Sequence, residues 1–338
     1  MSSKISILKI TPDYAIPGGE IEIFHELTEI SVNDLDCRIA GISAGIVAAS
    51  PDRILLRVPV DSVGGELEVT LSAAGATATS RIIVGEKIAE GLHIVANPAV
   101  DPEDGSIVTT KSGGRGQYLP ETMFRVRDGH SSAMPVNVLS PTGVAFDTDG
   151  SLLVTNRADG ELIRITEDFR SDVVASELGV ATGIAINGEG TVFVGDRSGK
   201  VLTVNKYGDA DTWVELPQSV SAYHMAFGPD DALYVSAPGL CSFDSVYRVN
   251  GPNDYEVFYK GLGRPQGLAF DRFGYLFVAA CLRGRHGIVR IPTAGGDAEW
   301  FLAGYSIVGL CFTSKGGLVV ATSDSLFEVE LMEAGVMG

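Results

Sequence analysis

Three stretches of this chain decide its fold: 141-PTGVAFDTDGSLLV-154, 181-ATGIAINGEGTVFV-194 and 265-PQGLAFDRFGYLFV-278. Each reads as an apolar strand, a turn rich in Asp, Asn and Gly, and a second apolar strand. Two further copies, 222-AYHMAFGPDDALYV-235 and 307-IVGLCFTSKGGLVV-320, keep the pattern, and a weaker one, 97-NPAVDPEDGSIVTT-110, precedes them. The third positions of the five clear copies, 143, 183, 224, 267 and 309, lie 40, 41, 43 and 42 residues apart. This spacing is typical of the four-stranded blades of a β-propeller.

The last copy predicts how the ring closes. Only MEAGVMG follows Leu331, which is too short for a fourth strand. We therefore expect the apolar segment 92-LHIVA-96 to complete the sixth blade, because a closed ring leaves no exposed sheet edge. The prediction is a six-bladed β-propeller over residues 91–338. Asp147 and Asp271 recur where a turn leaves the first strand, and we interpret them as turn residues.

The first 86 residues differ from the rest of the chain. They read as short alternating strands, with turn signals at PGG (17–19) and GG (64–65), and they show no helical periodicity. This pattern predicts an antiparallel β-sandwich over residues 1–86. The whole chain is therefore predicted to be all-β, a sandwich followed by a propeller.

Both parts resemble known families. The series ITP…IPGGEIEI, SPDRILLRVP and GELEVTLSAAGATATSRIIV is similar to the TIG/IPT immunoglobulin-like domain, which implies an immunoglobulin-like sandwich acting as an interaction or spacer module. The phrase G-[VIL]-A-F-D-x-x-G-x-L-[FLY]-V resembles NHL repeats and the gluconolactonase/regucalcin family of six-bladed propellers. This second resemblance implies the fold more strongly than an activity, because propellers host many functions.

Composition narrows the choice of partners. The 338 residues carry a formal net charge of −18, which argues against nucleic acid and anionic membranes as partners. The four cysteines form no CxxC pair, and the N-terminus has no apolar run of signal-peptide length. A cytoplasmic protein is expected if the sequence is full length, and secretion stays open.

The connectivity of a propeller predicts a site at one mouth of the central channel. Residues that enter each first strand and residues of the loop after each second strand meet at this mouth. The entering set is Asn97, Thr142, Thr182, Tyr223, Gln266 and Val308. His224 stands where the sister copies have glycine, and a register shift of one residue would bring it into this set. The loop set is rich in basic residues, and it consists of Lys111, Arg115, Asn156, Arg157, Asp196, Arg197, residues 241–244, Arg283, Arg285, His286 and Asp324.

The family resemblance also implies a metal site, which this sequence does not match. A Glu, an Asn and an Asp hold a divalent cation in the gluconolactonase/regucalcin pattern, where the cation polarises the lactone carbonyl. The matching places here fall near Ala96 or Asn97, on Tyr223 or His224, and on Gln266, so the expected carboxylates are missing. No cofactor is predicted, although a divalent metal stays an open alternative.

These observations favour a binding propeller that recognises a small polar or anionic ligand, or a protein partner, at the channel mouth. Arginine suits bidentate recognition of carboxylate or phosphate, and a basic rim focuses anions. One alternative is a lactone hydrolase with a remodelled site around His224, Gln266 and Asn97, in which His224 is the candidate catalytic group. Another is a scaffold that joins two partners. The structural alternative is a buried His224 and simply solvated arginines.

Overall fold

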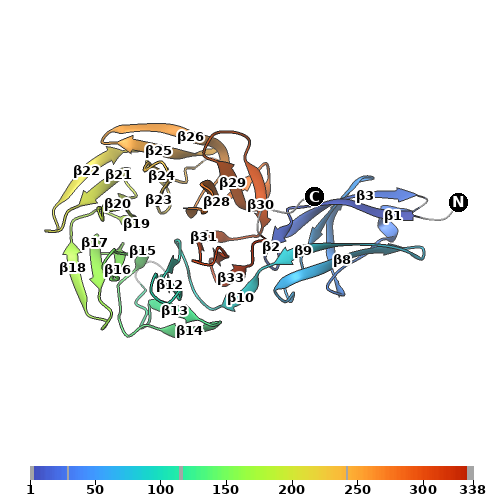
Figure 1. The fold of residues 1–338 in the computed structure, drawn as a ribbon, viewed down its shortest axis with the longest axis horizontal. Helices are drawn as coiled ribbons and strands as arrows, with labels where there is room; N and C mark the ends of the chain where they lie inside the picture. Colours follow the sequence, from blue (N-terminus) through green and yellow to red (C-terminus); the bar gives the residue numbers. More distant parts are fainter. Residues whose placement is uncertain (1–3, 29, 114–116, 241–242, 333–338) are drawn as a thin grey trace.

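The computed structural model describes residues 4–28, 30–113, 117–240 and 243–332, and it consists almost entirely of β-strands. Within these ranges the helical structure is one 3-10 turn at Val32–Asp34. No helix among the described residues is long and apolar enough to span a membrane. Figure 1 shows a ring of sheets with a smaller β-structure attached at one side.

The ring is a β-propeller, and the described strands form six groups of four around its axis (Figure 1). Blade 1 contains β11 (Ala99–Val100), β12 (Ile107–Thr110), β13 (Met123–Arg127) and β14 (His130–Ala133). Blade 2 contains β15 (Pro141–Phe146), β16 (Leu152–Asn156), β17 (Glu161–Ile165) and β18 (Ser171–Ala175). Blade 3 contains β19 (Ala181–Ile186), β20 (Val192–Asp196), β21 (Lys200–Val204) and β22 (Ala210–Glu215).

The remaining three blades follow the same antiparallel order. Blade 4 contains β23 (His224–Phe227), β24 (Leu233–Ser236), β25 (Asp244–Gly251) and β26 (Asp254–Gly263). Blade 5 contains β27 (Leu268–Phe270), β28 (Tyr275–Leu282), β29 (Arg285–Pro292) and β30 (Glu299–Ala303). Blade 6 contains β31 (Ile307–Phe312), β32 (Leu318–Thr322), β33 (Leu326–Val329) and β10 (Glu86–Ala89).

Each repeated phrase forms the two inner strands of a blade, as its pattern predicts. The apolar side chains pack between neighbouring blades: Leu153 and Leu162 of blade 2, for example, share a core with Val194 and Leu202 of blade 3. The interpretation of Asp271 as a turn residue is confirmed, since its Oδ1 accepts hydrogen bonds from the backbone N–H groups of Phe273 and Tyr275 at 2.9 and 2.8 Å.

The predicted closing strand is wrong by six residues. The strand that pairs with β33 is β10, with Lys87 opposite Phe327, and residues 92–96 form no strand. They instead carry the chain from the outer edge of blade 6 to the channel, and Leu92 and Ile94 donate backbone hydrogen bonds to Asp324 O and Ser323 O at 2.9 and 3.2 Å. Leu92 and Ile94 are buried and His93 is exposed, so this connection has the alternation of a half-buried strand.

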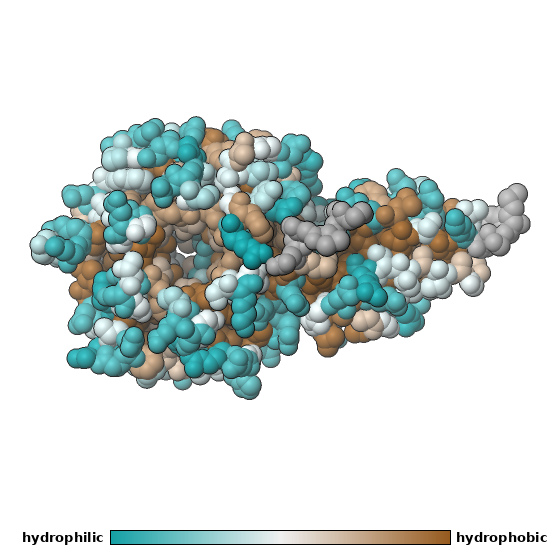
Figure 2. All heavy atoms as spheres, viewed as in Figure 1, coloured by the Kyte–Doolittle hydropathy of each residue, from teal (hydrophilic) through white to brown (hydrophobic). Residues whose placement is uncertain are grey.

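The innermost strands approach one another closely at the axis. A Cβ atom added at Gly183 would lie 2.6 Å from Tyr223 O, and one at Gly143 would lie 2.7 Å from Thr182 O. The repeated glycine is therefore a packing requirement between blades, which a larger side chain cannot meet without displacing the next strand. The ring nevertheless keeps a small opening at its centre, as Figure 2 shows.

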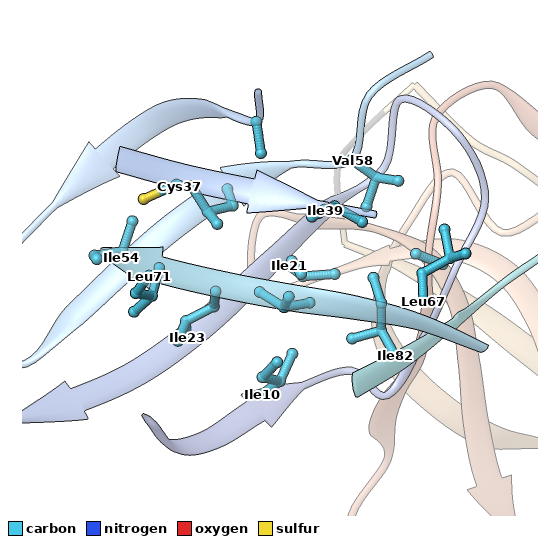
Figure 3. Close-up of a cluster of buried hydrophobic side chains, with 14 of the residues drawn as sticks. Ile10, Ile21, Ile23, Cys37, Ile39, Ile54, Val58, Leu67, Leu71 and Ile82 are labelled. Atoms are coloured by element: carbon cyan, nitrogen blue, oxygen red, sulfur yellow. The ribbon is translucent and has the colours of Figure 1, made fainter. Parts of the chain in front are cut away.

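The N-terminal part, residues 4–84, contains two sheets. One consists of β1 (Lys4–Thr11), β3 (Glu20–Thr28), β7 (Arg53–Arg57) and β6 (Gly45–Ala49), in that order. The other consists of β2 (Tyr14–Ala15), β9 (Ala76–Val84), β8 (Gly65–Ala73), β4 (Asp36–Ile39) and β5 (Ile42–Ser43). Buried side chains from both sheets, including Ile21, Ile54, Leu71 and Ile82, form one apolar core (Figure 3).

The axial packing predicts the effect of adding a methyl group. We expect Gly183→Ala to lower the free energy of unfolding by about 1–3 kcal/mol, because the new Cβ would overlap the backbone of Tyr223, directly before β23. Gly188→Ala is a matched control five residues away, since an added Cβ there meets nothing within 4 Å. Urea denaturation followed by circular dichroism measures both; equal losses would contradict the packing argument.

Candidate functional site

The structure places most of the predicted entering set between blades. Thr142, Thr182 and Tyr223 are 1%, 2% and 0% exposed. Thr182 Oγ1 donates to Gly195 O at 3.2 Å and accepts from the Tyr223 N–H at 3.0 Å, so it joins blades 3 and 4. The Tyr223 hydroxyl donates to Pro217 O, and burial raises its pKa. These three side chains are not positioned for contact with a ligand at the mouth.

Asn97 also has a structural role. Its Nδ2 donates to Leu268 O at 2.8 Å, and its Oδ1 accepts from the Leu310 N–H at 3.1 Å. The side chain therefore links the chain entering blade 1 to the innermost strands of blades 5 and 6. These bonds use one N–H and one acceptor position of the amide and fix its orientation between the blades.

His224 is buried at the start of β23 and is 3% exposed. Among the described residues, neither its Nε2 nor Thr142 Oγ1 on β15 has a hydrogen-bond partner. Burial lowers the pKa of His224 to about 4, so the ring is neutral at pH 7. In the described part of the chain, no three His, Cys, Asp or Glu side chains gather closely enough to hold a metal ion. The geometry is that of a buried structural histidine.

A cavity of about 890 Å³ lies to one side of the axis, over blades 5 and 6. Its walls come from the end of β26, the facing strands β28 and β29 with their turn, and the loop between β30 and β31. Several predicted residues line it: Gln266 and Val308 of the entering set, and Phe243, Arg283 and His286 of the loop set. The most distinctive lining residues that the prediction missed are Arg264 and Tyr305.

The cavity is positively charged. Arg264 and Arg283 line it, its lining contains no acidic side chain, and neither guanidinium has an ion-pair partner among the described residues. Arg283 and Gly284 form the two-residue turn between β28 and β29, and the φ of Arg283 is +50°. Such turns favour Asn, Asp or Gly, and an arginine there costs about 1 kcal/mol of backbone strain. Arg264 has a φ of +47°.

Aromatic rings flank a floor of small residues. Phe243 and Tyr305 are both exposed, and the ring of His286 lies 5.3 Å from the ring of Tyr305. Between them the lining is mainly glycine and alanine, including Ala279, Ala280 and Gly263. The cavity thus offers flat apolar faces beside two cations, which is a suitable arrangement for an organic anion.

The other predicted basic residues lie outside this lining. Arg157 is half-buried and Arg197 is exposed, and their part in ligand binding stays a prediction. Lys111 Nζ donates to Gly91 O at 2.8 Å. Arg115 and Cys241 fall outside the described residues. Arg264 immediately precedes the phrase 265-PQGLAF-270, and Tyr305 lies two residues before 307-IVGLCF-312, so the loops entering these strands contained the missed signal.

Comparison with known proteins supports the fold. No protein-family model matches the chain, and no curated protein matches it in sequence. Among solved structures, an auxiliary nutrient binding protein from Bacteroides ovatus is 11% identical with a TM-score of 0.58, covering 98% of this chain and 99% of that one. A structure named only provisionally as a gluconolactonase is 17% identical with a TM-score of 0.57, covering 73% and 91%. Virginiamycin B lyase from Staphylococcus aureus is 15% identical with a TM-score of 0.53, covering 73% and 97%.

The burial of His224 predicts a pH dependence of stability. The unfolded state takes up a proton below about pH 6.5, whereas the folded state resists it down to about pH 4. Stability should therefore fall by about 3 kcal/mol as the pH drops through this window. Thermal melts of His224→Gln between pH 7 and pH 4 should show a shallower slope. Exposed His130 offers the control His130→Gln; if both variants keep the wild-type slope, the assignment fails.

Proposed function

We propose that this protein is a binding propeller whose ligand is a small organic anion held in the cavity over blades 5 and 6. The observation that carries this proposal is that Arg264 and Arg283 both line a cavity without carboxylates, within a chain of net charge −18. An acidic protein that keeps two unneutralised guanidinium groups in one cavity attracts anions there and repels them elsewhere.

The chemistry of the lining supports this choice. A guanidinium group binds carboxylate or phosphate through two parallel hydrogen bonds, and the neighbouring aromatic faces can cover the apolar part of the ligand. The cavity volume of about 890 Å³ is within the usual range for small-molecule sites. The Bacteroides ovatus structure, which covers 98% of this chain, is named as an auxiliary nutrient binding protein, which supports a binding role here.

The alternative of a lactone hydrolase rests on the similarity of the fold to a gluconolactonase-like structure. The cavity lining supplies no carboxylate for a divalent cation, so the donor set does not fit the family's metal site.

We assign the two sheets of the N-terminal part to an immunoglobulin-like sandwich of the TIG/IPT kind over residues 1–86. The propeller unit then covers residues 91–338 together with its closing strand β10.

Citrate, a small tricarboxylate, is a direct probe of this proposal. Cys281 lines the cavity, so a bound anion should protect it from alkylation by iodoacetamide. Burial raises the pKa of Cys37 to about 11 and that of Cys311 to about 12, so these thiols react slowly, and Cys241→Ser removes the remaining one. We expect millimolar citrate to slow the alkylation of Cys281 in this background.

Arg264→Gln and Arg283→Gln should each weaken this protection about tenfold, because each removes a charged hydrogen-bond donor. The same change at Arg157 and Arg197 tests whether the wider rim takes part, and we expect a smaller effect there. Mass spectrometry of the modified peptide gives the rates. Protection that survives in the Arg264→Gln/Arg283→Gln double variant would overturn the proposed site.

A further inference from the structure

We propose that the N-terminal part is part of the ligand site, and that its segment 16–20 positions one wall of the cavity. This inference rests on the proposed function, because it concerns the same cavity. The wall in question is the segment 303–305, which joins β30 to β31. Gly304 and Tyr305 line the cavity, and the N-terminal part contacts all three residues of the segment.

The first contact holds the backbone of Ala303. β2 pairs in parallel with β30, with Ala15 opposite Ala303, and the Ile16 N–H donates to Ala303 O at 2.9 Å. The loop then passes so close that a Cβ added at Gly19 would lie 2.5 Å from Ala303 O. Gly19 is therefore required for the close approach of the N-terminal part to the propeller at this point.

The second contact is apolar. A Cβ added at Gly304 would lie 2.7 Å from Cγ1 of Ile16, so Ile16 packs directly on the outer side of the wall. Ile16 is 1% exposed and belongs to the core formed by blades 5 and 6. On the cavity side, the Gly304 N–H donates to His286 O at 3.2 Å. Gly304 thus lies between the N-terminal part and His286, a residue of the cavity lining.

The third contact fixes a side chain. The Tyr305 hydroxyl interacts with the Glu20 carboxylate, which accepts a hydrogen bond from Arg57 Nη2 at 2.8 Å. Burial works to raise the pKa of Glu20, but its interactions with Arg57 and Tyr305 and the charges of Arg57 and Arg285 hold that pKa below its usual value. Glu20 is thus an ionised acceptor that holds the Tyr305 ring beside His286.

A neighbouring ion pair supports the same wall from the opposite strand. Arg285, the first residue of β29, pairs with Glu22 of β3, and Arg53 lies 3.5 Å from the same carboxylate oxygen. Arg285 directly follows the Arg283–Gly284 turn, so the N-terminal part contacts the two sides of the cavity that carry Tyr305 and Arg283. Ligand binding and attachment of the N-terminal part to the propeller are therefore linked, and each should strengthen the other.

The test compares two glycines in the full-length Cys241→Ser background. Gly19→Ala introduces a Cβ against Ala303 O. The new Cβ of Gly45→Ala, also in the N-terminal part, meets nothing within 4 Å. We expect Gly19→Ala to raise the citrate concentration that half-protects Cys281 from iodoacetamide by about fivefold or more, through displacement of the wall. Gly45→Ala should match the parent protein.

A second pair of variants guards against a folding defect in Gly19→Ala. Glu20→Gln keeps the size of the side chain and weakens its interaction with Tyr305, and Glu66→Gln makes the same change at an exposed ion pair with Arg81. Glu20→Gln also removes a negative charge, so electrostatics alone would improve citrate binding; weaker binding therefore identifies a positioning role. Tyr305→Phe should have little further effect in the Glu20→Gln background, because both changes remove the same contact.

The outcomes separate the two proposals. Protection of the parent protein by citrate that depends on Arg264 and Arg283, with unchanged half-protection in Gly19→Ala and Glu20→Gln, overturns the positioning role and leaves the binding site standing. Absence of citrate protection in the parent protein overturns the proposed function itself. Selective loss in Gly19→Ala and Glu20→Gln, with both control variants normal, supports the shared site.

Discussion

The crowding of innermost strands at the propeller axis is the constraint on which the rest of the structure depends. The blades meet so closely that glycine recurs at 143, 183, 267 and 309, and at each of these an added Cβ would lie under 3 Å from a neighbouring segment of the chain. Polar side chains near the axis, such as Thr182 and Asn97, are consequently used to join blades. Room for a ligand of some size arises off the axis, where the loops of blades 5 and 6 diverge.

The sequence predicts the repeating part of the fold well, because each blade has the same local rules. Strand spacing, turn aspartates and glycine positions all follow from the two-residue alternation and from backbone sterics. The closing strand could not be predicted as reliably. A buried connection that crosses a blade end alternates like a strand, and the true strand, Glu86–Ala89, has two charged residues because it lies on the outer edge.

The candidate site was predictable in part. Gln266 and Arg283 follow from connectivity alone, since any residue of those loops must reach the same mouth. Tyr223 and His224 show the limit of this argument, because a shift of one residue in a pleated strand turns a side chain from the channel to the space between blades. The interaction of Glu20 with Tyr305 could not be inferred at all, since nothing in the repeat indicates which blade the N-terminal part contacts.

The position of β10 also sets an order of events for a growing chain. Glu86 pairs with Glu328, so the sixth blade joins segments separated by most of the propeller sequence, and β2 likewise needs β30 as a partner. During synthesis, the early edges wait until the last blade has emerged. Contacts over such separations are slow to form, and the waiting strand edges are the surfaces on which a chaperone, or another unfinished chain, would act.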